Sequence, residues 1–333
     1  MSSELWLRFD IRGAGWSASS AELCAAAIEQ AVWAEQNGFD AVTFGEHHGA
    51  ADGYLPSPLV LAAAIAARTH RIRLHLGALL LPLSHPLRLA EDVSVLDNIS
   101  NGRVDVTLGL GYLPSEFSMF GVDIRRRGAL MDEGIAALRA AFSGKPFEYR
   151  GVSVRVTPQP VQAGGPKLFI AGAVAASALR AARLGDGFYP TLPTPELLEL
   201  YRRECQNLGR PVGPIIDMTG PACVYVSLDP ERDWARAGPH MLYEMNTYSR
   251  WARESGVLTP WQEVDDIEAL KATGAYYVVT PDECVALFNR VRAAGKHIAF
   301  NPMCGGLHPD IAWQSLELMA QAVLPRLRHP LEN

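Results

Sequence analysis

Short apolar runs alternate with segments of helical periodicity along almost the whole chain. This alternation is typical of a parallel α/β fold, because each parallel strand needs a crossover connection that is usually a helix. Eight strands, each followed by a helix, predict a (β/α)₈ TIM barrel. The expected strands are Leu5–Phe9, Asp40–Phe44, Arg73–Leu80, Arg103–Gly109, Leu168–Ala171, Gly187–Tyr189, Ile215–Val226 and His297–Asn301.

The helical segments have recognisable starts and stops. The first, Ser20–Asn37, repeats its apolar residues on one helical face and is followed by Gly38, a common helix terminator. The other expected helices are Ser57–Thr69, Pro86–Ile99, Arg127–Phe142, Ala175–Leu184, Pro195–Leu208, Pro281–Ala294 and Pro309–Leu327. A small hairpin outside the barrel is expected from Phe147–Tyr149 and Val152–Val154.

A doubly wound sheet that binds a dinucleotide is the rival architecture. It needs three glycines in the pattern GxGxxG directly after a strand. The nearest match begins at Gly109 and Gly111, and Pro114 stands where the third glycine belongs. The sequence therefore favours the barrel.

The alternation fails between Asp229 and Ala275. This segment is polar, rich in aromatic residues and only partly helical in pattern, and it is longer than an ordinary connection. We expect it to be an insertion before the last βα unit, within a single domain of residues 1–333, and to cover the active site as a lid. Its aromatic residues include Trp234, Tyr243, Tyr248, Trp251 and Trp261.

Composition excludes several classes of protein. Thirty basic and 36 acidic side chains give a net charge of −6, which disfavours nucleic acids and anionic membranes as partners. The five cysteines include no CxxC pair, so neither a disulfide framework nor a metal site is predicted. The sequence shows no secretion signal and no apolar stretch of membrane-spanning length, which predicts a cytoplasmic protein.

Three adjacent ionisable residues, Glu46, His47 and His48, follow the second expected strand. The active site of a barrel lies on the loops at the carboxyl ends of its strands, so this turn is the first candidate. A metal site is disfavoured because neighbouring residues on a strand or turn point in different directions. His47 is the candidate catalytic residue, since an imidazole exchanges protons near neutral pH. Glu46 and His48 are better explained as hydrogen-bonded structure that holds the turn.

Small residues mark the ends of the third and fourth strands. Gly77 and Ala78 would let a flat ligand approach the backbone, although tight helix packing would also explain them. After the fourth strand, Gly109 opens space, while Tyr112 and Glu116 can line a cavity.

The fifth strand leads into a helix start rich in small residues, with Ala171, Gly172, Ala173 and Ser177. Unpaired backbone amides at a helix start, with a hydroxyl nearby, can cradle a phosphate group. Alone this signal is weak, because many helices begin with glycine and alanine. It gains weight in a barrel, whose later βα loops often bind phosphate.

Taken together, several motifs in a fixed order resemble the luciferase-like flavin monooxygenases, a family of barrel enzymes. The resemblance is dense over residues 20–190 and looser towards the C-terminus. The matching stretches are Ala34–Asp40, Glu46–His48, Thr69–Leu74, Leu81–Pro86, Ala90–Asp92, Leu96–Arg103, Gly109–Tyr112, Glu116–Phe117, Phe120–Gly121, Ile170–Gly172 and Ala181–Gly187.

The resemblance implies a reduced flavin across the strand ends, with its ring against the third strand and its reacting edge facing His47. It also implies a cis peptide bond between Gly77 and Ala78, and a phosphate site at Gly172, Ala173 and Ser177. The cofactor-binding residues expected in this way are Glu46, Gly77, Ala78, Gly109, Tyr112, Ala171, Gly172, Ala173 and Ser177. The expected substrate-binding residues are Phe9, Glu116 and Phe117.

From the resemblance we expect reduced FMN, supplied by a separate flavin reductase, to react with dioxygen and oxidise a small organic substrate such as an alkanal or a ketone. Leu110 departs from the family pattern, because luciferase has an arginine for the FMN phosphate there. This departure leaves phosphate binding to the backbone and Ser177. Related branches of the family use a deazaflavin coenzyme for hydride transfer, and the resemblance does not separate them, so this coenzyme is an alternative. A non-catalytic flavin-binding protein is another. The family also suggests a homodimer, for which the small face Ala62–Ala67 would allow close helix packing.

Overall fold

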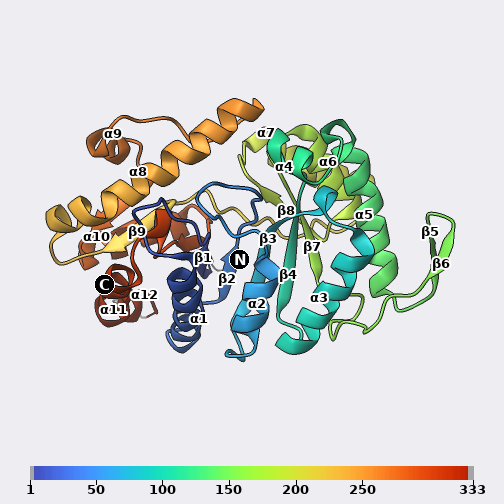
Figure 1. Ribbon diagram of the computed structural model, residues 1–333, viewed down its shortest axis with the longest axis horizontal. Helices are drawn as coiled ribbons and strands as arrows, with labels where there is room; N and C mark the ends of the chain where they lie inside the picture. The colour runs from blue at the N-terminus through green and yellow to red at the C-terminus, as the bar shows by residue number, and fades with distance from the viewer. Residues whose placement is uncertain (1–3, 329–333) are drawn as a thin grey trace. The chain divides into compact units, whose positions relative to one another are not determined.

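The computed structural model describes residues 4–328, which form two compact units (Figure 1). The first unit contains the chain up to Thr43, the segment Ala50–Leu55 and the chain from Asp217 onward. The second unit contains Phe44–Gly49 and Pro56–Ile216. Each unit is built of strands and helices in alternation, so the prediction of a parallel α/β fold is confirmed.

Four parallel strands form the sheet of the second unit, in the order β3 (Arg73–Leu80), β4 (Val104–Gly109), β7 (Lys167–Gly172) and β8 (Gly187–Pro190). Their carboxyl ends lie at the same edge of the sheet because the strands are parallel. The helices of this unit are α2 (Pro58–Ala66), α3 (Pro86–Ser100), α4 (Pro114–Met119), α5 (Arg127–Phe142), α6 (Ala175–Leu184) and α7 (Pro195–Asn207), with short helices η1 (Leu81–Leu83) and η2 (Ile124–Arg126).

The predicted hairpin is confirmed as β5 (Phe147–Tyr149) and β6 (Val152–Val154), which pair antiparallel. It lies outside the sheet of the second unit and is drawn in green beyond α5 in Figure 1.

Arg103 connects the carboxyl ends of two helices of the second unit to the start of β3. Its guanidinium is buried and donates to the carbonyls of Ala66, at the end of α2, and Ser100, at the end of α3. It also donates to the Ile72 carbonyl just before β3. Asn101 takes a left-handed conformation that ends α3 and turns the chain towards Arg103. The motif Asn101–Arg103 therefore has a structural role, because it holds the ends of α2 and α3 against the start of β3.

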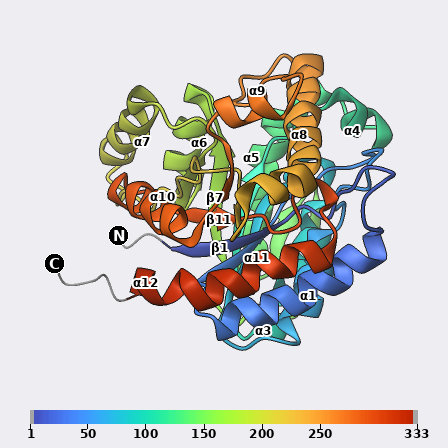
Figure 2. The ribbon, with the colours of Figure 1, turned by 90° about the vertical axis from the view of Figure 1, so that its left-hand side faces the viewer.

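In the first unit the strand order is β11 (Ile298–Phe300), β1 (Leu5–Phe9) and β2 (Ala41–Phe44), and β1 is parallel to β11. β9 (Cys223–Val226) and β10 (Tyr276–Val279) form a separate parallel pair. The helices are α1 (Ser20–Gln36), α8 (Pro230–Ser255), α9 (Ile267–Ala272), α10 (Pro281–Ala293), η3 (Cys304–Gly306), α11 (Pro309–Ala322) and α12 (Leu324–Arg328). Figure 2 shows α11 running alongside α1, with which it is in contact.

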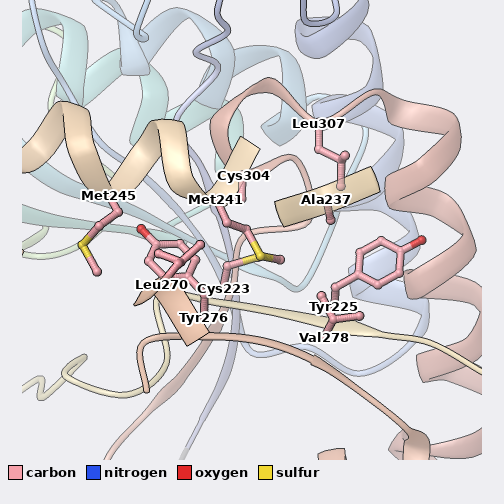
Figure 3. Packing of buried hydrophobic residues seen from close by; sticks show 10 residues of the cluster. All are labelled: Cys223, Tyr225, Ala237, Met241, Met245, Leu270, Tyr276, Val278, Cys304 and Leu307. Atoms are coloured by element: carbon pink, nitrogen blue, oxygen red, sulfur yellow. The ribbon is translucent and has the colours of Figure 1, made fainter. Parts of the chain in front are cut away.

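A hydrophobic cluster fixes α8 against the pair β9–β10 (Figure 3). Ala237, Met241 and Met245 come from successive turns of α8 and are almost fully buried. They pack on Tyr276 and Cys223 from the two strands, which places one face of α8 over the strand pair.

Two predictions about the C-terminal part of the chain are wrong. The strand expected over Ile215–Val226 is only Cys223–Val226, because Asp217 Oδ1 accepts hydrogen bonds from the amide and hydroxyl of Thr219 in a turn. Ile215 makes only an isolated bridge to Phe188. The final helix is divided in two at Val323, just before Leu324 and Pro325.

The segment Asp229–Ala275, which was expected to be only partly helical, contains the two helices α8 and α9. Asp229 caps α8, a helix of 26 residues that ends at Gly256 in a left-handed conformation. Pro239 lies inside this helix and disguises it in the sequence, since proline is a strong helix breaker. The structure also contains the unpredicted strand β10 directly after the segment.

Candidate functional site

The predicted turn after β2 is built around a buried carboxylate of the second unit. Glu116 on α4 is fully buried, and its Oε1 lies 2.9 Å from His47 Nδ1. The same oxygen accepts the backbone amide of His48 at 2.9 Å. Because Oε1 is an acceptor for both groups, we assign the Nδ1 proton of His47 to this hydrogen bond. The reactive lone pair of the neutral imidazole is then on Nε2.

The ring of His47 is held from a second side by an aromatic residue. Tyr112 meets it edge-on, with 5.6 Å between ring centroids and an interplanar angle of 83°. The His47 side chain is only 10% exposed. Two neighbours therefore fix the orientation of a largely buried imidazole.

Glu46 and His48 form a second pair at the same turn. Glu46 Oε1 lies 2.9 Å from His48 Nε2, and Glu46 Oε2 accepts the amide of Leu80 at 2.8 Å. The His48 ring also packs edge-on against Phe120, at 4.7 Å. Glu46 thus fastens the turn to the carboxyl end of β3, in the scaffold role that the sequence suggested.

The wall formed by β3 and β4 is made of small residues. The peptide bond Gly77–Ala78 is cis, as the family resemblance implied, and the pairing register of β3 with β4 shifts there. A Cβ on Gly109 would lie 3.2 Å from the Ala78 Cβ, which is tighter than ordinary packing. Glycine at position 109 therefore leaves room above Ala78 that any larger residue would fill.

The three expected substrate-binding residues lie deeper than expected. Glu116 and Phe117 are buried to within 1% exposure, and Phe117 packs below Gly111, where an added Cβ would lie 3.0 Å from its ring. Phe9 is 1% exposed within the first unit. Such side chains offer almost no surface to a ligand, and Glu116 instead bonds to His47 and to the His48 amide.

Between β7 and α6, Gly172 permits a close packing of the helix start. A Cβ on Gly172 would lie 2.4 Å from the Ser177 Cβ, and the Gly172 φ of 154° is rare for other residues. Ser177 is 1% exposed; its hydroxyl donates to the Val174 carbonyl at 2.6 Å and accepts the Val174 amide at 3.2 Å. Ser177 thus closes the capping box of α6 on the N-cap residue Val174. The Val174 and Ser177 amides are bonded within this box. Amides in the first turn of a helix have no intrahelical acceptor, so those of Ala175 and Ala176 are the donors available to a phosphate.

A buried polar cluster in the first unit was not predicted from the sequence. Arg8, Asp10 and Arg12 alternate along the end of β1, and Glu244 and Asn301 join them from α8 and from the residue after β11. The signal was present as three charged residues at alternating positions beside a buried strand.

Within residues 4–328, no group of three or more His, Cys, Asp or Glu side chains is arranged to hold a metal ion. The five cysteines are free thiols. None of the helices described here combines the length and apolar character needed to cross a membrane.

Comparison with known proteins identifies relatives. The sequence model of a family described as luciferase-like monooxygenase matches residues 6–297. The chain is 32% identical over 166 residues to 4-hydroxyprotoasukamycin monooxygenase of Streptomyces nodosus subsp. asukaensis, covering 46% of this chain and 43% of the relative. It is 30% identical over 151 residues to the oxygenase component of the flavin-dependent trigonelline monooxygenase of Acinetobacter baylyi, covering 43% and 42%. The chain spans about half the length of the curated relatives it matches.

Solved structures resemble the chain over nearly its whole length. Monooxygenase RslO1 from Streptomyces bottropensis matches with a TM-score of 0.75 and 28% identity, covering 97% of this chain and 99% of that one. Two more distant matches share the fold, each with a TM-score of 0.68 and 98% coverage of this chain. One is the oxygenating constituent of a Pseudomonas putida 3,6-diketocamphane monooxygenase in complex with FMN, 20% identical, and 99% of that chain is covered. The other is an F420-dependent secondary alcohol dehydrogenase, 15% identical, and 100% of that chain is covered.

Proposed function

The chain belongs to the luciferase-like monooxygenase family, and we propose that it is the oxygenase component of a flavin-dependent monooxygenase. It uses reduced FMN and dioxygen to oxidise a small organic substrate, an alkanal-like compound or a ketone. The observation that carries this proposal is the oriented His47–Glu116 pair at the end of β2, in a chain of this family. The oxygenase component named among its relatives supports a separate flavin reductase as the partner that delivers reduced FMN.

The residues of the second unit fit a flavin. The small residues Gly77, Ala78 and Gly109 leave room for a flat ring against β3 and β4. The start of α6 offers backbone amides to a phosphate. Leu110 provides no positive charge, so the helix start would carry the phosphate contacts. When bound, reduced FMN would supply the electrons that activate dioxygen.

His47 would handle the proton of the reaction. With Nδ1 donating to Glu116, its Nε2 can take a proton from the substrate side and return it. The imidazole is nearly buried, which keeps bulk water from competing for that proton. Glu116 acts through His47 and positions it.

Three further expectations form part of the proposal. The strands close into a (β/α)₈ barrel, α8 and α9 serve as the lid and substrate wall, and the chain works as a cytoplasmic homodimer. The helices support the lid assignment, because α8 carries Tyr243, Tyr248 and Trp251 on the unit that also holds Phe9.

Hydride transfer with a deazaflavin coenzyme is the second candidate function. Leu110 removes the arginine expected for the FMN phosphate, and the F420-dependent neighbour has the same fold. A flavin-binding protein without turnover is the alternative outside enzymology.

Anaerobic titration of the protein with reduced FMN, and separately with reduced deazaflavin, tests the proposal. We expect saturable binding of reduced FMN and rapid consumption of oxygen once air is admitted. Binding of the deazaflavin alone would replace the proposal by hydride transfer. Tight binding of oxidised FMN with no protein-dependent oxygen chemistry would point to the non-catalytic alternative.

A further inference from the structure

Arg12 is a fully buried cation with an unused donor. It lies in the loop after β1, and its side chain has no exposed surface. Its Nε and Nη2 both donate to Oδ2 of Asp52, at 2.8 and 2.5 Å. Its Nη1 is buried and has no hydrogen-bond partner among the described residues. Buried donors of charged groups are almost always paired, so an unpaired one points to a missing acceptor.

Aromatic rings surround this guanidinium and form what we call the Arg12 cage. The distances from the Arg12 Cζ atom to the ring centroids are 4.8–5.8 Å, the range of cation–π contacts. The cage residues are Tyr54, Tyr243, Tyr248 and Trp251. Mostly aromatic walls with one directed polar donor are the usual composition of a small-molecule site.

The backbone beside Arg12 is held in an unusual conformation. Ile11 has a φ of 47°, a left-handed value that a β-branched residue rarely adopts. The flanking chain is fixed by two hydrogen bonds, from the Leu55 amide to the Asp10 carbonyl and from the Gly13 amide to the Asp52 carbonyl. Strain of this kind persists where the surroundings fix it, and it gathers at ligand-binding sites.

The charges around Arg12 decide which acceptor fits. Arg8 pairs with Asp10 at 2.8 Å and Arg12 pairs with Asp52, so both cations are already neutralised. Glu244 lies in the same cluster, where burial raises the pKa of its carboxyl. An anionic ligand would add negative charge to this balanced cluster, whereas a neutral acceptor would satisfy Nη1 without doing so.

We propose that Arg12 is the recognition group of a substrate subsite, with Nη1 donating to the carbonyl oxygen of a neutral aromatic or conjugated ring compound held by the Arg12 cage. This inference rests on the proposed function and narrows its substrate class, away from aliphatic and anionic compounds.

The loop that carries Trp16 provides the entrance to this subsite. Trp16 is 58% exposed, and its ring lies edge-on to Tyr243 of the cage and to His240. A Cβ on Gly15 beside it would meet no atom within 4 Å. Arg12 has no exposed surface, so a ligand reaches Nη1 only when rings of the cage move, and Trp16 is the exposed ring that packs on one of them.

Three matched probes test the proposal by equilibrium dialysis against the full chain. They are 2-acetylnaphthalene, which has a neutral carbonyl, 2-ethylnaphthalene, which lacks the acceptor, and 2-naphthoate, which is an anion. We expect the ketone to bind at least tenfold more tightly than either of the others. Equal binding of the ketone and the hydrocarbon would overturn the role of Nη1, and preferential binding of the naphthoate would overturn the charge argument.

Arg12→Lys keeps a cation for Asp52 but removes Nη1. We expect the ketone preference to fall below twofold in this variant. The control Arg232→Lys, at an arginine of α8 whose side chain is 57% exposed and pairs with Asp233, should keep it. A preference retained in Arg12→Lys contradicts the proposal. Because the wild-type comparison needs no variant, poor folding of Arg12→Lys leaves the test intact.

The titration with reduced FMN separates this inference from the proposed function. Loss of probe selectivity together with normal flavin binding and oxygen consumption rejects the subsite alone. Selective ketone binding by a chain that does not react as a flavin monooxygenase rejects the proposed function alone.

Discussion

Glu116 is the residue on which the geometry of His47 depends. Its Oε1 takes two hydrogen bonds, and its Oε2 is buried with no partner among the described residues. Leaving such an atom unpaired costs roughly 1–3 kcal/mol, so the fold sacrifices stability at this position. An apolar side chain would avoid that cost but could not orient the imidazole.

Glu116→Ala should release His47 from its fixed tautomer. In ¹⁵N spectra of the imidazole, we expect the wild type to show one predominant form protonated on Nδ1, and the variant to show a mixture. Glu116→Gln keeps an acceptor oxygen and should restore most of the wild-type pattern. An unchanged tautomer in Glu116→Ala would remove Glu116 from the role of positioning His47.

Glu244 should make stability depend on pH. Burial raises the pKa of its carboxyl in the folded chain, so the native state holds a proton that the unfolded state releases above about pH 4.5. Stability from this group is therefore complete at low pH and falls as pH rises towards the folded-state pKa, by up to about 1.4 kcal/mol per pH unit.

Glu244→Gln should abolish that slope in denaturant unfolding measured between pH 4.5 and 7.5. Glu196→Gln, at an exposed position of α7, serves as the control and should leave the slope as it is in the wild type. If Glu244→Gln unfolds with the wild-type pH dependence, the buried carboxyl does not titrate as described.

At the scale of elements, the sequence predicted what local patterns encode. Arg73–Leu80 and Arg127–Phe142 are predicted to the residue, since their boundaries follow from apolar runs and turn residues. α8 was missed because Pro239 breaks the local rule while burial of Met241 and Met245 against β9 and β10 outweighs it. The candidate site shows the same contrast between local features, which the sequence predicted, and long-range contacts, which it did not.

The position of the Glu46–His48 turn could be read from the sequence, but its partners could not. Glu116 reaches His47 from 69 residues away, and no local pattern records such a contact. The Arg12 cage likewise joins residues of the β1 loop to α8.

The β7–α6 connection gives a prediction at this scale. Gly172→Ala would place a Cβ 2.4 Å from that of Ser177, which must shift the start of α6 and misdirect its amides. We expect affinity for reduced FMN to fall at least tenfold. Gly151→Ala, at a positive φ but with nothing within 4 Å, should cost a similar backbone strain of about 1 kcal/mol and leave flavin affinity unchanged. Equal losses in both variants would mean that the α6 start does not hold the phosphate.

At the scale of the whole molecule, fold and cofactor are separate questions. Structures with the same fold include one in complex with FMN and one with an F420 adduct, so the fold alone does not choose the electron carrier. In our proposal that choice is made in the second unit, and the substrate is chosen by the first unit, where the buried cluster around Arg12 lies.

The proposed homodimer predicts a concentration-dependent mass. Val60 on α2 is 72% exposed, next to the small Ala62–Ala67 face, and a charge there would be buried in any dimer that packs on this helix. Sedimentation equilibrium should show a dimer for the wild type and a monomer for Val60→Asp. Dimers of equal stability in both proteins would place the interface elsewhere.

The origin of the oxygen atom in the product tests the central claim most directly. Reduced FMN, ¹⁸O₂ and a panel of aldehydes and aryl ketones are mixed with the protein, and products are analysed by mass spectrometry. We predict one ¹⁸O atom in the product, with a yield lowered by about 10²-fold in His47→Ala, the usual scale of acid–base catalysis. Product formed without label, and only with the reduced or oxidised deazaflavin, would contradict the account.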